Sequence, residues 1–425
     1  MKPHISKSKL SPSLLLSEGS SSTSSETEET SPFPLQHTKL ISKSFSSHRP
    51  LAILSGHMTS VSCLSLSGDF ILSASLSKDI VVWQKQDFML LDKFGHGDGS
   101  VKSLVTAGDK IFSAHQDGKI RVWKVSRGSS EKNVFKLVET LPTTKDYLGK
   151  FMKQSNYVQT RRHHKTLWIE HSDSISCLTV SNGFIYSGSW DKTLKVWNLS
   201  SFKCLESIKA HDDAINGLVA CKGVVYSASA DGKIKAWGRK EGSKKNKNKK
   251  ISHCLKGVLK GHHKDSSFNC VLVSQDGKWV YGGDSNGFIM EWEKIDIQTN
   301  SDTMMNQYLE RFNESWKLVS ETRAHEMAVL CMCLKGEILL SGSSDRSIGI
   351  WKREGFNGGL CKLGVINGHE GPVKCLEASC RNTNDGGFLL YSGSMDKSLR
   401  VWWVSMYNEE DTEDNSSVYC IKNSE

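Results

Sequence analysis

The chain has 425 residues, of which 24% are charged and 37% are hydrophobic, and its formal net charge is +9. This charge is small for the length, so composition alone gives no argument for nucleic-acid binding. The 12 cysteines have no paired metal-type spacing, and no stretch approaches the roughly 20 apolar residues of a membrane-spanning helix. We therefore expect a soluble protein with free thiols in the cytoplasm, the nucleus or both.

Serine and threonine dominate residues 1–48, as in SEGSSSTSSETEETSP. This segment contains too little apolar surface to offset the entropy of ordering a backbone, so we expect it to be disordered. A chloroplast transit peptide is the alternative interpretation. Such peptides are poor in acidic residues, and the four glutamates between residues 18 and 29 argue against one.

A repeated unit fills residues 49–405. Each unit has a His, an apolar strand, a turn with Gly, a second strand, an Asp-type turn and a third strand that carries Trp. The opening residues are His57, His96, His171, His211, His262, His325 and His369. The closing residues are Trp83, Trp123, Trp197, Trp237, Trp292, Trp351 and Trp402. His and Trp are 26 positions apart in four of the seven units.

A repeat of about 40 residues, with three strands and a fourth that leads to the next His, is typical of four-stranded propeller blades. The predicted fold is all-β, a single seven-bladed propeller. The segment HRPLAILSGH supplies an outer strand that the last repeat lacks, so we expect the two ends to complete one blade. The remaining segments are insertions near 126–165 and 295–320, a basic loop at 239–250 and an acidic C-terminal tail at 406–425.

With these features the sequence resembles WD-repeat proteins from about residue 50 to 405. The resemblance implies a hydrogen-bonded set of His, Ser, Asp and Trp within each blade. In three repeats the set is His171, Ser187, Asp191 and Trp197; His211, Ser227, Asp231 and Trp237; and His325, Ser341, Asp345 and Trp351. The other matching serines and aspartates are Ser73, Ser113, Ser392, Asp117 and Asp396. The first repeat has Ser77 where Asp is expected, and the fifth has Gly282 at the Ser position and Asn286 at the Asp position. We therefore expect these two blades to lack part of the hydrogen-bonded set and to be the least stable.

A closer resemblance covers about residues 139–216. The stretch TLPTTKDYLGKFMKQSNYVQTRRHHKTLWIEHSDSISCLTVS is similar to the plant Jingubang-type WD-repeat proteins. This resemblance implies a plant regulatory protein without enzyme activity.

Candidate binding residues follow from blade geometry. The turn between the second and third strands lies on one rim of a propeller, so the residue before the repeat Asp is expected to project there. That position holds Leu76, Gln116, Trp190, Ala230, Ser285, Ser344 and Met395. Trp190 is our main candidate anchor because Trp is enriched at interaction hot spots, with packing under a neighbouring loop as the alternative. A second hypothesis is that Asp173, Asp212 and Asp213 select a basic partner at the same rim, with turn capping as the alternative.

Other chemistry is disfavoured. The Ser, His and Asp residues recur in the repeats, so a catalytic triad is not expected. His163-His164 and His262-His263 have no Cys or carboxylate at a metal-binding spacing, and we expect neither a metal nor a cofactor. The basic clusters at 161–165 and 239–250 have no interleaved aromatic residues for base stacking, which favours solvated loops over nucleic-acid contacts. A nuclear-localisation signal at 239–250 stays a hypothesis.

The expected function is therefore that of a non-catalytic scaffold or adaptor in a plant regulatory pathway. Its partners would be other proteins, held by a monomeric propeller within larger complexes. The alternative is a substrate receptor of a cullin-RING ubiquitin ligase. Such receptors usually carry Asp or Asn after the repeat Trp with Arg two places later, and Trp197-Asn198-Leu199-Ser200 and the other repeats do not.

Overall fold

A computed structural model describes residues 48–97, 99–127, 133–161, 164–240, 251–262, 266–296, 314–353, 359–380 and 386–405. The Ser-rich head, residues 241–250 of the basic loop and the tail from residue 406 lie outside these ranges. So do His163, His263 and most of the insertion near 295–320.

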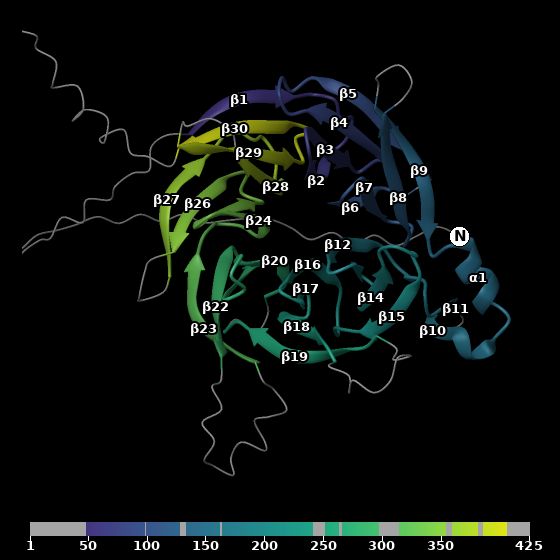
Figure 1. Cartoon of the computed structure of the whole chain (residues 1–425). Coiled ribbons are helices and arrows are strands. Elements are labelled where there is room, and N and C mark those ends of the chain that lie inside the picture. Colours follow the sequence, from purple (N-terminus) through teal and green to yellow (C-terminus); the bar gives the residue numbers. More distant parts are fainter. Residues whose placement is uncertain are drawn as a thin grey trace, which may run out of the picture. The chain divides into compact units, whose positions relative to one another are not determined.

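Seven four-stranded antiparallel sheets form the blades, and Figure 1 shows them arranged in a ring. Blade 1 has β2 (Val61–Ser67), β3 (Phe70–Ser75), β4 (Asp79–Gln84) and β5 (Leu90–Gly95). Blade 2 has β6 (Val101–Ala107), β7 (Lys110–His115), β8 (Ile120–Arg127) and β9 (Asn133–Leu141). Blade 3 has β12 (Ile175–Ser181), β13 (Phe184–Ser189), β14 (Thr193–Asn198) and β15 (Cys204–Lys209).

The other four blades follow the same order from the inner to the outer strand. Blade 4 has β16 (Ile215–Cys221), β17 (Val224–Ser229), β18 (Lys233–Arg239) and β19 (His253–Lys260). Blade 5 has β20 (Phe268–Val273), β21 (Trp279–Asp284), β22 (Phe288–Asp296) and β23 (Glu314–Arg323). Blade 6 has β24 (Val329–Lys335), β25 (Ile338–Ser343), β26 (Ile348–Arg353) and β27 (Leu360–Ile366). Blade 7 has β28 (Val373–Cys380), β29 (Gly387–Ser394), β30 (Leu399–Ser405) and β1 (His48–Leu54).

Blade 7 closes the ring with strands from both ends of the propeller. β1 pairs antiparallel with β30, with Leu54 opposite Leu399 and His48 opposite Val404. The inner strand β28 also contacts β2 of blade 1, and every other inner strand contacts the inner strand of the next blade. The predicted completion of one blade by the two ends is therefore confirmed.

The insertion between blades 2 and 3 adds the structure's only helices among the described residues. It contains α1 (Thr144–Lys150), the short 3-10 helix η1 (Gln154–Asn156) and a hairpin of β10 (Tyr157–Arg161) and β11 (His164–Leu167). Figure 1 shows this insertion on the outer side of the ring, beside β9 and β15. Thr143 caps α1 by accepting a hydrogen bond from the Asp146 amide.

Seven apolar clusters form the core, and each lies between two neighbouring blades. In every cluster the closing Trp of one blade packs against the blade before it. Trp197, for example, packs with Phe112 and Ile120 of blade 2. The middle strands are buried on both faces, as in β13, whereas outer strands such as β15 are partly exposed. The hydrophobic effect therefore stabilises each blade mainly through its neighbours.

A buried serine joins Trp and His within six of the blades. In blade 3 the Trp197 indole donates to Ser187 Oγ at 2.9 Å, and His171 Nε2 lies 2.8 Å from the same oxygen. His171 Nδ1 lies 2.9 Å from Asp191. Burial lowers the pKa of His171, so the ring is neutral: its one N–H faces the carboxylate, and Ser187 donates to Nε2.

Blades 4, 6 and 7 contain the same four-residue set. The serine-to-histidine distances are 2.7 Å in blade 4, 2.8 Å in blade 6 and 2.7 Å in blade 7. The aspartates lie 2.9, 2.9 and 2.8 Å from histidine Nδ1. The residues are His211, Ser227, Asp231 and Trp237; His325, Ser341, Asp345 and Trp351; and His369, Ser392, Asp396 and Trp402.

The prediction that His96 opens the second repeat is wrong. His96 is exposed, and His115 on β7 occupies its place, with Nε2 2.8 Å from Ser113 Oγ. His115 lies two residues after Ser113 and so reaches the same hydroxyl from within the strand. Because His115 Nδ1 faces the Gly99 carbonyl, Asp117 bonds to Arg121 instead.

The fifth repeat also departs from the prediction made for its His. The His262 ring is largely exposed and lies 3.2 Å from Glu321. Gly282 offers no hydroxyl at the serine position, so the set that joins Trp and His elsewhere cannot form in this blade. Blade 1 keeps His57, Ser73 and Trp83, while Ser77 bonds to Ser75 and to the Asp79 amide.

Replacing the shared serine is expected to destabilise the propeller. In Ser227→Ala, the buried His211 and Trp237 each lose a partner, which lowers the free energy of unfolding by about 2 to 4 kcal/mol. Denaturant unfolding measures the change. The control is Ser55→Ala at an exposed position, and equal stability of the two variants would contradict the assigned role of Ser227.

Restoring the missing aspartate is expected to stabilise blade 1. Burial lowers the pKa of His57 to about 4, so the unfolded chain binds more protons than the folded one between about pH 6.5 and pH 4, and stability falls as pH drops through that window. In Ser77→Asp, a carboxylate beside Nδ1 raises the pKa of His57 and reduces this loss. An NMR titration measures the pKa of His57, and unfolding curves at both ends of the pH window measure the loss of stability. An unchanged His57 pKa would refute the prediction.

Candidate functional site

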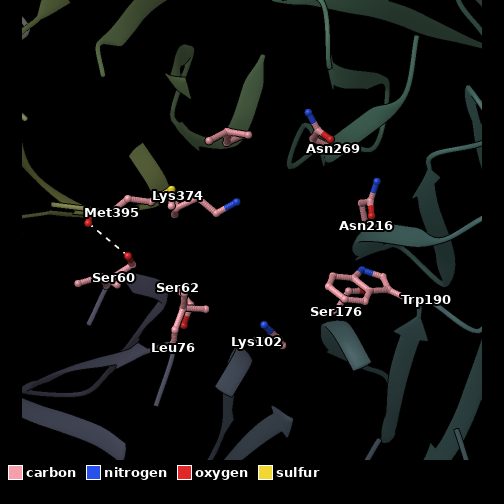
Figure 2. A pocket seen from close by; sticks show the side chains of 12 residues that line it. Ser60, Ser62, Leu76, Lys102, Ser176, Trp190, Asn216, Asn269, Lys374 and Met395 are labelled. Carbon is pink, nitrogen blue, oxygen red and sulfur yellow. Dashed lines mark hydrogen bonds between the residues drawn. The ribbon is translucent and has the colours of Figure 1, made fainter. Parts of the chain in front are cut away.

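The central channel of the ring is lined by one position of each inner strand. This position follows the first residue of the strand and holds Ser62, Lys102, Ser176, Asn216, Asn269, Leu330 and Lys374. Leu76, Trp190 and Met395, from the turns between second and third strands, join them around a cavity of about 400 Å³ (Figure 2). We call this cavity, with these ten of its twelve lining residues, the channel mouth.

A bulge-like irregularity places these residues at the channel, because the strand register shifts across this position in all seven inner strands. In β2, Val61 packs toward blade 7 and Cys63 packs toward blade 2, and Ser62 between them has no partner in the register. The repeated cysteines Cys63, Cys177, Cys331 and Cys375 are all buried, and burial raises the pKa of Cys63 and Cys177 to about 12. These thiols therefore act as small packing groups.

The polar channel residues link neighbouring blades. Ser62 donates to the Val101 carbonyl at 2.9 Å. Asn216 and Asn269 donate in the same way to the next blade, to Phe268 O and Val329 O, each at 3.0 Å. Ser176 makes the equivalent bond to the carbonyl of Ile215. Each asparagine amide nitrogen thereby uses one of its two N–H donors, and the side-chain oxygens are acceptors at the mouth.

Two lysines of the mouth differ from these linking residues. Figure 2 shows the amines of Lys102 and Lys374 directed into the opening. Burial, together with the positive charge of Lys374, lowers the pKa of Lys102. Among the described residues, no carboxylate lines the mouth, and neither ammonium is within ion-pair distance of one.

Trp190 is held at the mouth by its turn. Lys192 has a φ of 72° and its amide donates to the Ser189 carbonyl, which closes the turn. The Asp191 carboxylate accepts the Thr193 amide and so fixes the start of β14. The Trp190 side chain is 44% exposed, so no neighbouring loop covers it. Lys102 Nζ lies 5.7 Å from its ring centroid.

The rim residues predicted from the sequence separate into two groups. Leu76, Trp190 and Met395 belong to blades 1, 3 and 7, line the mouth and are each about half exposed. Gln116 is exposed and accepts a hydrogen bond from Ser100. The small residues of blades 4, 5 and 6, which are Ala230, Ser285 and Ser344, do not line the cavity. The large apolar turn residues at the mouth therefore come from blades 7, 1 and 3.

The three aspartates proposed to select a basic partner lie in loops of this face, before β12 and β16. Asp212 lies 3.3 Å from Lys233, and Asp213 lies 3.9 Å from Lys192. Asp173 accepts the Ser174 amide. Each one therefore has a partner within its own loop or blade, while the mouth itself carries the two lysines.

The four mouth residues Lys102, Lys374, Asn216 and Asn269 were not among the predicted site residues. A signal for two of them, Asn216 and Lys374, exists in the sequence. Ser62, Ser176, Asn216, Leu330 and Lys374 all come five positions after their repeat His, a spacing that marks the channel side of the inner strand.

A second cavity of about 950 Å³ lies between the β10–β11 hairpin and β15. Two of its charged groups, Lys195 and Glu206, are engaged within the protein. Lys195 donates to the Trp168 carbonyl and to Ser207, and Glu206 accepts from His253. These bonds attach the insertion and blade 4 to blade 3.

The buried Ser, His and Asp sets do not form an accessible nucleophilic site, because the serine hydroxyl lies between Trp and His and is fully buried, as Ser187 is. Within the described ranges, no three His, Cys, Asp or Glu side chains gather as a metal site. In the same ranges, no helix has the length and apolarity needed to cross a membrane.

The WD domain, G-beta repeat family matches seven segments of this chain, at residues 48–84, 89–124, 162–198, 202–238, 253–293, 316–352 and 360–402. The chain belongs to the WD40 repeat family. Each matched segment ends at or next to a closing Trp. WD40 propellers typically bind other proteins and are not catalytic.

Relatives of this WD40 protein include two from Arabidopsis thaliana and one from Bos taurus. Protein ROOT INITIATION DEFECTIVE 3 is 30% identical over 33% of this chain and 28% of its own length. Zinc finger CCCH domain-containing protein 59 is 29% identical over 26% of this chain and 18% of its own length. Bovine WD repeat-containing protein 18 is 23% identical over 37% of this chain and 45% of its own length. The chain thus spans less than half the length of these relatives. The computationally designed Ika8 protein shares the fold, with a TM-score of 0.52 and 21% identity over 84% of this chain and 99% of its own.

Two tryptophans of blade 3 are expected to differ in their effect on stability. Trp190→Ala removes a half-exposed side chain and changes the free energy of unfolding by less than about 1 kcal/mol. Trp197→Ala empties a fully buried site between blades and costs about 3 to 5 kcal/mol. Denaturant unfolding compares the two, and a loss for Trp190→Ala as large as for Trp197→Ala would assign Trp190 to the core.

Proposed function

We propose that this WD40 protein is a non-catalytic scaffold or adaptor that captures a segment of a partner protein at the channel mouth. The observation that carries the proposal is the exposure of Leu76, Trp190 and Met395 around one opening. Half-exposed apolar and aromatic side chains that gather around a cavity are the usual composition of a binding hot spot. The ring does not need them, because its blades pack through a different Trp.

We further propose that the protein acts in a plant regulatory pathway, in the cytoplasm, the nucleus or both, as one propeller within larger complexes. Two observations support a plant setting. Residues 139–216 resemble the Jingubang-type proteins, and two of the relatives are plant proteins, one of them named for a defect in root initiation.

Affinity purification from plant cells tests the proposal. The wild type is compared with a Trp190→Ala, Met395→Ala double variant and with a control variant, Met89→Ala, Leu91→Ala, whose two apolar residues are exposed near and on the outer strand of blade 1. We expect a set of proteins that the wild type and the control recover in equal yield and the mouth variant does not.

Equal recovery of the same proteins by all three chains would show that the channel mouth is not the capture site. Recovery of a cullin with the wild type would favour the alternative role as a ubiquitin-ligase receptor.

A further inference from the structure

The channel mouth carries a positive charge that the architecture of the ring does not explain. At the channel position, Ser62, Asn216 and Asn269 each donate a hydrogen bond to the next blade. In blades 2 and 7 the same position holds Lys102 and Lys374, which make no such bond among the described residues. A partly buried cation, Lys102, and an exposed one, Lys374, therefore line the same opening, and no carboxylate among the described residues lines it with them.

The placement of Lys102 is costly for the free protein. Burial, together with the positive charge of Lys374, lowers the pKa of Lys102. Lys102 is partly relieved by the face of Trp190. An anionic group bound between the ammoniums would remove this repulsion, so the mouth is complementary to negative charge.

The lining residues also indicate which anion fits. The mouth has no arginine among the described residues, so it lacks the planar fork that holds a phosphate through several bonds. Its donors are two separate point charges from blades 2 and 7. Two single carboxylates, or one shared carboxylate, match this arrangement, and the asparagine oxygens can accept peptide N–H groups.

We propose that the channel mouth recognises an acidic peptide segment of the partner protein, whose Asp or Glu carboxylates bind Lys102 and Lys374 while apolar side chains of the same segment pack on Trp190 and on Met395, which lie on opposite sides of the opening in Figure 2. This inference rests on the proposed function and specifies the chemistry of the captured segment. It reverses the charge preference considered for Asp173, Asp212 and Asp213.

An array of random synthetic peptides tests the inference with the full chain. One set contains Asp and Glu, and a parallel set contains phosphoserine in their place. We expect bound peptides from the wild type to be enriched in Asp and Glu beside an apolar residue. For a peptide so selected, the Kd rises by about tenfold or more in the Lys102→Gln, Lys374→Gln variant, since charge-assisted bonds are lost.

Matched variants separate charge from structure. Lys136→Gln, Lys260→Gln removes the same charge from exposed positions on outer strands, and its Kd is expected to equal that of the wild type. Lys102→Arg, Lys374→Arg keeps the charge and is expected to keep most of the affinity. Thermal melts confirm that the variants fold, and the single variant Lys374→Gln provides a test at the more exposed lysine.

The outcomes distinguish this inference from the proposed function. Apolar peptides that bind without acidic enrichment, or an acidic preference that survives in the Lys102→Gln, Lys374→Gln variant, would overturn the inference and leave the proposed function intact. Binding of the phosphoserine set alone would overturn the assignment to carboxylates. Peptides that bind the Trp190→Ala, Met395→Ala variant as well as the wild type would overturn both.

Discussion

One buried serine hydroxyl in each of six blades accepts a hydrogen bond from the closing Trp and lies within hydrogen-bond distance of a His. This contact fixes the Trp that packs against the preceding blade, so it couples the polar interior of a sheet to the apolar interface beside it. In four blades an Asp extends the contact to the turn before the third strand. The conformation of these turns therefore depends on a buried serine hydroxyl that no ligand can reach.

The separation between buried structural residues and exposed turn residues explains why the proposed binding surface lies at the channel mouth. Residues that hold the ring are buried and hydrogen-bonded to one another, whereas the turn residues Leu76, Trp190 and Met395 are each about half exposed. Blades 4 to 6 place small residues at that point, and blades 1, 3 and 7 place large apolar ones. The mouth is consequently asymmetric, with its large apolar turn residues and its two lysines on blades 7, 1, 2 and 3.

The sequence predicts most of the fold because the repeat is redundant. A His and a Trp at a constant spacing specify seven blades, and the leftover strands at the two ends specify how the ring closes. The failures are local. His115 could not be preferred to His96 from spacing alone, since a histidine inside the second strand reaches the same serine by a different route.

The candidate site was only partly predictable for a related reason. Turn position identifies Trp190 and Met395, but nothing in the spacing says which rim residues gather at one opening. The two lysines of the channel belong to no recognised motif, and their place at one opening depends on the closure that brings blade 7 beside blade 1, which in turn contacts blade 2. Such a juxtaposition of distant positions becomes visible only in three dimensions.

Hydrogen exchange of the protein with and without a recovered partner tests most directly whether the channel mouth is the face that captures proteins. The account predicts slower exchange in the turns that carry Leu76, Trp190 and Met395, and unchanged exchange in the opposite turns at Gly68, Gly183 and Gly223. Protection confined to those opposite turns or to the outer strands would contradict it.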